Sequence, residues 1–388
     1  MQTSRRTFLI GLSALGLTAG ANDRWRDITT FLEEQQSSGV FPGAVLLASQ
    51  HGRRELARCQ GAYCSLTRRD APLHEGVLHP LYSFSKLVSA TVVMMAVGDG
   101  LVRLDAPVTT YIPEFTGGGK EKITLRHLLT HSAGIPAVPL GSAMSDADWK
   151  QAVAAVCTAK TDWEPGSRTA YHALSGLFVA AEIVRRQTAG KPWDTICRER
   201  LFAPIGARSL TFALPKDEAP VALTPQPKEL PKTLREVFQY AGHPAGGCFG
   251  TAADALKVLQ LHLDGGTWKG KRLLKEQSLR EMHTVQYQKE IDAARAAGKA
   301  PVHEPWGLGP LLRGPGPKAG GHDWFGFRDQ TSPGIFGHAG IDTVIGVADP
   351  VGERAVVFIT TQSPPSSEMT VAVRNGVVNR AFAALPVR

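Results

Sequence analysis

A serine and a lysine three residues apart stand at the head of a long apolar run. Ser83 and Lys86 lie in LYSFSKLVSA, residues 81–90, and the apolar run continues to Val97. In a helix, side chains at i and i+3 share one face, so the Lys86 amine can reach the Ser83 hydroxyl. Burial of the helix would favour the neutral amine that a base must be. The pair predicts a nucleophile with its proton acceptor one turn away.

The Ser-x-x-Lys spacing alone is weak support, because serine is a common N-cap and lysine a common helix residue. Ser83 is, however, the only serine of this chain with a lysine at that spacing. It also lies where an extended segment passes into a helix. The N–H groups of a first helical turn have no intrahelical acceptor, so the Ser83 N–H is available to stabilise an oxyanion.

Seven short motifs follow one another along the chain. They are SFSK (83–86), DGLVRLDAPVTTYIPEF (99–115), ITLRHLLTHSAGIP (123–136), WEPGSRTAYH (163–172), GGCFGTAADALKVL (246–259), WGLG (306–309) and FGHAGIDTVIG (336–346). In this order the chain resembles the serine β-lactamase-related family. The resemblance is to the branch of the penicillin-recognising serine hydrolases that contains class C β-lactamases, family VIII-type esterases and D-alanyl-D-alanine carboxypeptidases.

The resemblance implies a role for each matching residue. Ser83 matches the nucleophile that forms an acyl-enzyme, and Lys86 matches the amine beside it. Tyr171 matches the tyrosine that shuttles a proton to the leaving group. His338-Ala339-Gly340 matches the third element of the family, on a strand lining the site, and Ile341 would supply a second oxyanion N–H. Whether Lys86 or Tyr171 is the base stays open, and each of Tyr171 and His338 alone would also suit a structural role.

Two positions depart from the family pattern. Ala173 stands where the family has an asparagine that orients the substrate and the lysine. His338 stands where the lactamases carry a lysine, which removes a fixed charge that would meet a substrate carboxylate. A competing Lys318-Ala319-Gly320 lies in a Gly/Pro-rich loop, so we prefer His338. Both departures favour an esterase over an efficient β-lactamase.

The elements that position these residues are strands at both ends of the chain with helices between them. Residues 41–63 read as two strands joined at a polar turn around 50–54, and strands recur around 343–348 and 355–361. Helices are expected from about 26–36, from the opening motif to Val97, and over about 124–134, 145–159, 174–188, 251–264 and 368–385. Residues 213–235 are Pro- and Lys-rich and read as a long surface excursion.

This pattern predicts a mixed α/β (α+β) fold of the β-lactamase/transpeptidase type. An antiparallel sheet would be built from about residues 22–100 and 320–388 and flanked by helices, with an inserted, mainly helical lobe over about 101–319. Together, residues 22–388 would form one serine hydrolase domain.

Residues 1–21 form a separate segment. Arg5 and Arg6 precede a short apolar stretch that ends in Ala19-Gly20-Ala21, the arrangement of an export signal. The stretch SRRTFL resembles a twin-arginine signal. We therefore expect export to the periplasm or the cell exterior, with cleavage after Ala21 as a separate expectation.

The remaining composition is that of an ordinary globular protein, with 43% hydrophobic and 20% charged residues. The net charge of +8 comes from scattered basic residues, so nucleic acid is not an expected partner. No membrane span is expected in the mature chain, and the oligomeric state stays open. No sequence pattern indicates a metal or organic cofactor. Of the five cysteines, Cys59 and Cys64 are close enough in sequence to bridge a turn, but free thiols are the default.

The leading hypothesis is an exported serine hydrolase that acts on a small ester or amide. The alternatives are a D-alanyl-D-alanine carboxypeptidase or weak β-lactamase acting on peptidoglycan-like substrates and, from another class, a non-catalytic ligand-binding relative. Intact Ser83, Lys86 and Tyr171 favour an enzyme, whereas Ala173 is what the non-catalytic alternative would predict.

Overall fold

The computed structural model describes most of the chain after residue 22. The described residues are 23–138, 140, 145–171, 174–224, 229–238, 241–313, 330–341 and 343–387. The proposed export signal, Ala173 and the competing Lys318-Ala319-Gly320 lie outside them.

One seven-stranded sheet organises the fold. Its order is β3-β2-β1-β11-β10-β9-β8, and all neighbours are antiparallel. The strands are β1 Gly43–Gln50, β2 Arg53–Tyr63, β3 Ala71–Pro72, β8 Leu311–Leu312, β9 Phe336–Gly340, β10 Val344–Asp349 and β11 Arg354–Thr360. In the centre β1 pairs with β11, from Ala44 opposite Thr360 to Gln50 opposite Arg354. The expected sheet of N- and C-terminal segments is confirmed.

The central strands are buried on both faces. Along β1, Val45 and Leu47 join the larger hydrophobic core, whereas Ala44, Leu46 and Ala48 join a second core on the opposite face. This split follows from the period of two in a strand, which sends successive side chains to opposite faces. Continuous apolar sequence in β1 therefore reflects helices packed on both sides of the sheet.

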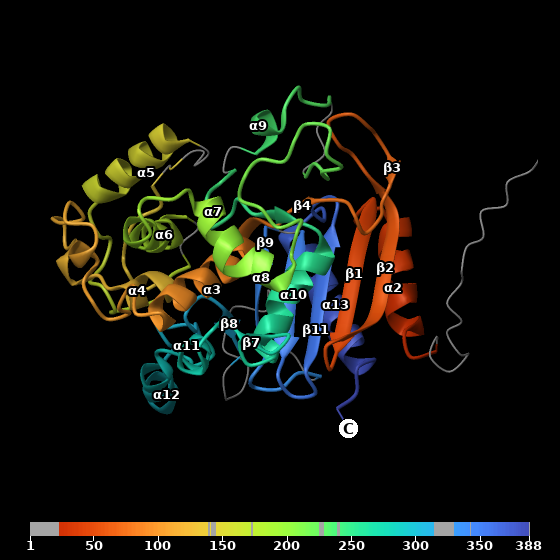
Figure 1. The fold of residues 1–388 in the computed structure, drawn as a ribbon. Coiled ribbons are helices and arrows are strands. Elements are labelled where there is room, and N and C mark those ends of the chain that lie inside the picture. Colours follow the sequence, from red (N-terminus) through yellow and green to blue (C-terminus); the bar gives the residue numbers. More distant parts are fainter. Residues whose placement is uncertain are drawn as a thin grey trace, which may run out of the picture.

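Those helices come from distant parts of the chain. On one face α2 (Arg26–Ser37) and α13 (Ser367–Ala383) pack together, and α10 (Ala252–Leu263) covers the other face (Figure 1). Thr251 caps α10 as expected, because its side chain accepts a hydrogen bond from the Asp254 N–H. Residues 101–319 were expected to form the helical lobe. Two of their elements belong with the sheet instead: α10 packs on its face, and β8 is its edge strand.

The helical part surrounds α3 (Ser85–Gly98), which is buried from Ser85 to Ala96. Around it lie the shorter helices on the left of Figure 1. Those with four or more residues are α4 Leu125–Leu129, α5 Asp146–Thr158, α6 Ser175–Gln187, α7 Trp193–Cys197, α11 Glu276–Met282 and α12 Gln288–Ala296. Thr124 and Ser145, where two of the expected helices begin, are N-caps, each in a capping box.

The remaining elements are short. They are the 3₁₀ turns η1 Tyr82–Phe84, η2 Val108–Thr110 and η3 Lys120–Lys122, the π-helical turn η4 Arg198–Phe202, the helices α8 Ala203–Ile205 and α9 Leu234–Val237, and the strand pairs β4 His79–Pro80 with β5 Phe249–Gly250 and β6 Thr267–Trp268 with β7 Lys271–Arg272.

The excursion at residues 213–235 is more packed than its composition suggests. In its described part Val221, Leu223 and Leu234 are buried, and with Phe238 and Phe249 they form a small core of their own. Charged and proline residues dominate the sequence of this segment. Its few apolar residues, which pack into the small core, therefore form no recognisable pattern. The described part of the segment is therefore packed against the rest of the molecule.

All five cysteines, including Cys59 and Cys64, are free thiols in the structure. Burial raises the pKa of Cys59 to about 11 and that of Cys197 well above the ordinary thiol value. Within the described residues no helix is long and apolar enough to cross a bilayer.

Candidate active site

Ser83 lies in η1, the single 3₁₀ turn that leads directly into α3. It is half-buried and lines a cavity of about 810 Å³. The helix start predicted for it is therefore a tighter turn, placed one step before the α-helix. Since η1 and α3 are continuous, Ser83 and Lys86 still share one face.

The Lys86 amine contacts the Ser83 hydroxyl. Its Nζ lies 3.1 Å from Ser83 Oγ and donates a second hydrogen bond of 3.0 Å to the carbonyl oxygen of Ala245. The side chain is only 1% exposed, as expected for the head of a buried helix. Water is thus excluded from the amine, and the hydroxyl is one of its few partners.

Tyr171 approaches Ser83 from the loop before α6. Its phenol Oη donates to Ser83 Oγ at 2.8 Å, and Lys86 Nζ lies 5.1 Å from the centre of its ring. Trp306 stacks on the same ring, with centroids 5.9 Å apart and an interplanar angle of 18°. The structure therefore brings Ser83, Lys86 and Tyr171 together at one oxygen atom, although Tyr171 is far from the other two in sequence.

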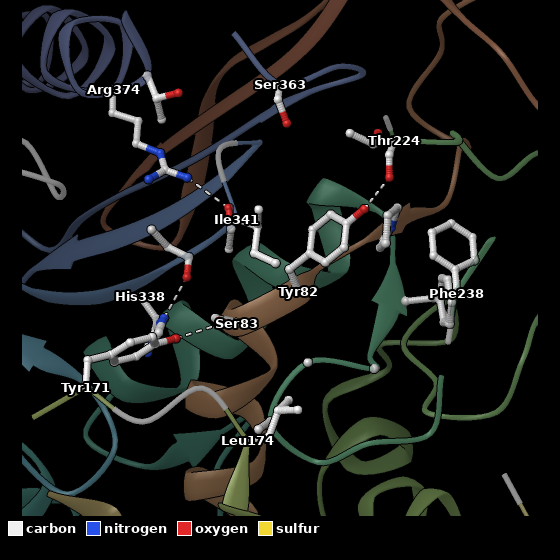
Figure 2. A pocket seen from close by; sticks show the side chains of 18 of the residues that line it. Tyr82, Ser83, Tyr171, Leu174, Thr224, Phe238, His338, Ile341, Ser363 and Arg374 are labelled. Atoms are coloured by element: carbon white, nitrogen blue, oxygen red, sulfur yellow. Dashed lines mark hydrogen bonds between the residues drawn. The ribbon is translucent and has the colours of Figure 1, made fainter. Parts of the chain in front are cut away.

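His338 lies in β9, behind Tyr171 (Figure 2). It is 1% exposed, and its Nδ1 donates to the carbonyl oxygen of Ala339 at 2.8 Å. Burial and the positive charge of Lys86 lower the pKa of His338 to about 3. The imidazole is consequently neutral near pH 7, so it offers no positive charge to a substrate carboxylate.

The end of β9 packs tightly against the turn that holds Ser83. A Cβ on Gly340 would lie 2.4 Å from the carbonyl oxygen of Leu81, which is closer than real Cβ atoms approach. Ile341 follows at the mouth of the cavity, with 62% of its surface exposed. The oxyanion role expected of the Ser83 and Ile341 N–H groups stays a prediction.

Apolar side chains make up most of the cavity wall. They come from the helical part, from the 213–238 segment and from α13, and include Leu174, Val237, Phe238, Phe249 and Val371. Arg374 also lines the cavity and donates to the carbonyl oxygens of Gly340 (2.8 Å) and Val344 (3.3 Å). The arrangement suits attack on a carbonyl carbon that carries an apolar group.

Sequence reasoning missed several residues of this cavity. Tyr82 precedes the nucleophile position, and Phe238 lies just beyond the stretch 213–235 that was taken as a surface excursion. Trp306 belongs to the WGLG motif, which was the only signal for it. Within the described chain no cluster of three or more His, Cys, Asp or Glu side chains is suited to hold a metal ion.

Comparison with known proteins identifies the class. The family model described as Beta-lactamase matches residues 28–377, which is most of the chain. The chain therefore belongs to the β-lactamase family of serine hydrolases, in agreement with the expected resemblance.

Named relatives include several kinds of hydrolase. Esterase EstB of Burkholderia gladioli is 28% identical over 260 residues, which are 56% of this chain and 64% of EstB. Penicillin-binding protein 4 of Amycolatopsis lactamdurans is 29% identical over 47% of this chain and 50% of that protein. A putative D-alanyl-D-alanine carboxypeptidase of Escherichia coli K12 is 22% identical, over 95% of this chain and 92% of its own. The chain thus spans between half and two thirds of the first two relatives.

Solved structures share the fold. EstCE1, a hydrolase with promiscuous acyltransferase activity, superposes with a TM-score of 0.72 at 19% identity, over 93% of this chain and 100% of its own. A family VIII carboxylesterase superposes with a TM-score of 0.70 at 22% identity, over 92% and 97% of the two chains. At this identity the likeness concerns the architecture alone.

Proposed function

We propose that this protein is a serine hydrolase that forms an acyl-enzyme on Ser83 and hydrolyses a small ester or amide. The observation that carries the proposal is the pair of hydrogen bonds at Ser83 Oγ, 3.1 Å from Lys86 Nζ and 2.8 Å from Tyr171 Oη. A hydroxyl is a weak nucleophile until a neighbouring base takes its proton. Here two candidate proton acceptors share the same hydroxyl.

In the proposed reaction Ser83 Oγ attacks the substrate carbonyl carbon while Lys86 or Tyr171 takes its proton. The N–H groups of Ser83 and Ile341 stabilise the oxyanion. Tyr171 then returns a proton to the leaving alcohol or amine, and the acyl-enzyme remains. Water attacks the acyl carbonyl, the same groups move its proton, and the acid product leaves Ser83 free.

Two features favour an ester over a β-lactam. The neutral imidazole of His338 replaces a fixed cation, and the cavity wall is mainly apolar. Similarity to Esterase EstB points the same way. The second candidate is a D-alanyl-D-alanine carboxypeptidase or weak β-lactamase. It is supported by the nearly full-length match to the E. coli relative and by the Arg374 cation in the cavity wall.

A panel of three reagents tests the proposal. The purified mature protein is exposed to a fluorophosphonate probe, a short-chain nitrophenyl ester and a chromogenic cephalosporin. The Ser83→Ala variant removes the proposed nucleophile, and Ser38→Ala, an exposed serine at the end of α2, is the matched control. We expect labelling and ester hydrolysis in the wild type and in Ser38→Ala, and neither in Ser83→Ala.

Each other outcome has a defined meaning. Full ester activity in Ser83→Ala would refute the nucleophile assignment. Rapid cephalosporin turnover would favour the second candidate, and a wild type that is neither labelled nor active would favour the non-catalytic alternative.

We also propose that residues 1–21 direct export. The paired Arg5 and Arg6 and the small residues before Asn22 support this. Replacing both arginines by lysine should retain the charge but abolish twin-arginine recognition, so the protein should accumulate in the cytoplasm of a bacterial host. Unchanged export of this variant would contradict the twin-arginine assignment.

A further inference from the structure

Tyr82, the residue before the proposed nucleophile, has a backbone conformation that side-chain-bearing residues avoid. Its φ is +44°, in the left-handed region where a Cβ crowds the backbone. Such strain persists only where the surroundings hold it, and it concentrates at functional sites. At Tyr82 the contacts of the side chain hold the backbone in this conformation.

A chain of hydrogen bonds holds the Tyr82 phenol. Its Oη donates to the carbonyl oxygen of Thr224 at 2.5 Å, and Thr224 Oγ1 donates to the carbonyl oxygen of Thr361 at 3.1 Å. Thr361 Oγ1 in turn donates to the carbonyl oxygens of Ala62 (2.9 Å) and Gly43 (3.2 Å). The phenol is thus connected, through the 213–238 segment, to the central strands of the sheet.

Burial keeps this chain intact across the physiological range. It raises the pKa of Tyr82 well above the ordinary phenol value, so the proton that Oη donates is retained. On the other side of the residue, a Cβ on Gly340 would lie 3.0 Å from Tyr82 Cβ. The strained turn is therefore held between β9 and Thr224.

The ring of Tyr82 fills space next to the nucleophile position. Tyr82, Ser83, Thr224 and Phe238 all line the same cavity, and Figure 2 shows the ring extending from the turn at Ser83 toward Thr224. The contact of Tyr82 Cβ with β9 and the strained backbone hold the base of the ring, and the hydrogen bond to Thr224 adds a second hold at the phenol. A substrate group bound beside Ser83 meets a rigid aromatic wall.

We propose that Tyr82 is a specificity-determining residue that limits the size of the substrate's apolar acyl group next to Ser83. The inference rests on the proposed ester hydrolysis and names its substrate class, esters with short acyl chains. Removing the ring would join its volume to the existing cavity, on the side of Phe238. Esters with long acyl chains should then gain relative to short ones.

The test compares three variants on p-nitrophenyl acetate, butyrate and octanoate. Tyr82→Gly removes the ring and suits a positive φ, and Tyr82→Asn is a second small residue that tolerates this conformation. Tyr82→Phe keeps the ring but loses the hydrogen bond to Thr224. Tyr111→Phe, whose hydroxyl accepts from the Arg103 N–H away from the cavity, is the control.

For Tyr82→Gly and Tyr82→Asn we expect the octanoate-to-acetate ratio of kcat/KM to rise by on the order of 10-fold or more, the scale on which apolar pockets discriminate chain length. Tyr82→Phe should keep the wild-type ratio, even where both rates fall, and Tyr111→Phe should match the wild type. Thermal unfolding shows whether each variant is folded. If one of Tyr82→Gly and Tyr82→Asn does not fold, the ratio measured for the other tests the inference.

Two results would overturn the inference alone: an unchanged ratio in a folded small variant, or the same rise in Tyr82→Phe. In both cases the wild type still hydrolyses esters and Ser83→Ala does not, so the proposed function stands. If the wild type hydrolyses none of the three esters, the proposed function and this inference fail together.

Discussion

At the scale of single residues, the site depends on an amine held out of water. Lys86 is 1% exposed and divides its donors between Ser83 Oγ and the carbonyl oxygen of Ala245. His243 accepts a hydrogen bond from the Ala245 N–H through Nδ1 at 3.1 Å, in the peptide before the carbonyl that Lys86 contacts. A second buried side chain thus helps to hold the residue to which the amine donates.

Replacing Lys86 by methionine tests its part in proton transfer. Met is of similar length and apolar, so the buried helix should be at least as stable as in the wild type. Acylation of Ser83 should slow by on the order of 10²-fold or more if the amine moves the proton. The measurement is the rate of fluorophosphonate labelling, with thermal unfolding as the check on folding. An unchanged labelling rate would reduce Lys86 to a structural residue.

Tyr171→Phe separates the hydroxyl from the ring. The ring contacts with Trp306 and His131 remain, whereas the 2.8 Å hydrogen bond to Ser83 is lost. We expect kcat for ester hydrolysis to fall by roughly 10²–10⁴-fold, the range for a general acid–base group.

The control for Tyr171→Phe is Tyr287→Phe. It also removes a phenol hydrogen bond, 2.7 Å to Ser132 Oγ, outside the cavity, and it should retain activity. Equal activity in both variants would exclude a chemical role for the Tyr171 hydroxyl.

Among residues, the sequence identified those that belong to ordered motifs and missed those placed by tertiary contact. Ser83, Lys86 and Tyr171 converge as the motif order predicts, although their catalytic roles stay predictions. Tyr82 gives no sequence signal, because a tyrosine with positive φ is not recognisable from its neighbours. Phe238 reaches the cavity only through the packing of a segment 155 residues further along the chain than Ser83.

At the scale of elements, glycines allow η1 to rest directly on the sheet. A Cβ on Gly340 would lie 2.4 Å from the Leu81 carbonyl oxygen, and one on Gly346 would lie 2.3 Å from the Phe84 ring. Both strands of the β9–β10 pair therefore lack a side chain where η1 crosses them. This contact sets the position of the Ser83 N–H relative to Ile341.

Gly340→Ala should push η1 away from β9. We expect a loss of about 1–3 kcal/mol in the free energy of unfolding, the usual range for overpacking, together with a lower kcat. Denaturant unfolding and ester kinetics measure the two effects. Gly334→Ala is the control, since its nearest neighbour would lie at an ordinary 3.5 Å. A Gly340→Ala protein with wild-type stability and activity would contradict the proposed contact.

A buried histidine, His262, and a half-buried one, His283, connect α3, α10 and the residue that follows α11. Thr91 Oγ1 donates to the Leu87 carbonyl oxygen, so it accepts from His262 Nε2 at 2.8 Å. His262 Nδ1 then accepts from His283 Nε2 at 3.0 Å. Because its Nδ1 accepts a hydrogen bond, the His262 ring must be neutral in this order of donors. Burial lowers the pKa of its partner His283 from 6.5 to about 4.

Acid should therefore destabilise the protein. His283 becomes protonated below about pH 6.5 in the unfolded chain but only below about pH 4 in the folded protein. The free energy of unfolding therefore decreases as the pH falls from 6.5 to 4. The shift corresponds to about 3 kcal/mol for this one group. His283→Gln keeps an N–H donor without titrating, and it should flatten the pH dependence of the free energy of unfolding between these values.

The control for this prediction is His51→Gln, at an exposed histidine 3.3 Å from Glu353. It should leave the pH dependence close to that of the wild type. An identical slope in His283→Gln and the wild type would show that the acid response comes from other groups, such as His79, whose pKa burial lowers to about 4.

Helices with caps and strands with long apolar runs were predictable at this scale. Thr124, Ser145 and Thr251 mark helix starts that the structure confirms. Two-residue strands such as β8 have no periodicity of their own, since their partners alone define them. The same holds for η1, whose 3₁₀ geometry follows from its contact with β9 and β10.

At the scale of the whole molecule, the cavity lies where the sheet meets the helical part. Its wall takes residues from η1, the loop before α6, the 213–238 segment, β9 and α13. The sequence predicted a sheet completed by both ends of the chain, because apolar strands occur only there. The sequence did not predict that α10 covers the sheet. An amphipathic pattern shows that one face of a helix is buried, but not which element buries it.

The free state of all five thiols makes the fold independent of redox conditions. Cys197 and Cys248 are fully buried, and burial raises the pKa of both, so neither is a reactive thiolate near neutral pH. We expect the same unfolding temperature with and without dithiothreitol, and five alkylated cysteines by mass spectrometry after unfolding without reductant. A lower unfolding temperature in reductant would indicate a bond between Cys59 and Cys64.

The central pairing of β1 with β11 also bears on how the chain reaches its folded state. Gln50 contacts Gly352, 302 residues away. Loop closure over such a span adds little to the thermodynamic balance, but pairings between distant segments slow folding. Until β11 has been synthesised, the β1–β2 hairpin presents an unpaired apolar edge to other chains. The period of greatest risk of aggregation is therefore the time between synthesis of the first hairpin and arrival of its last partner strand.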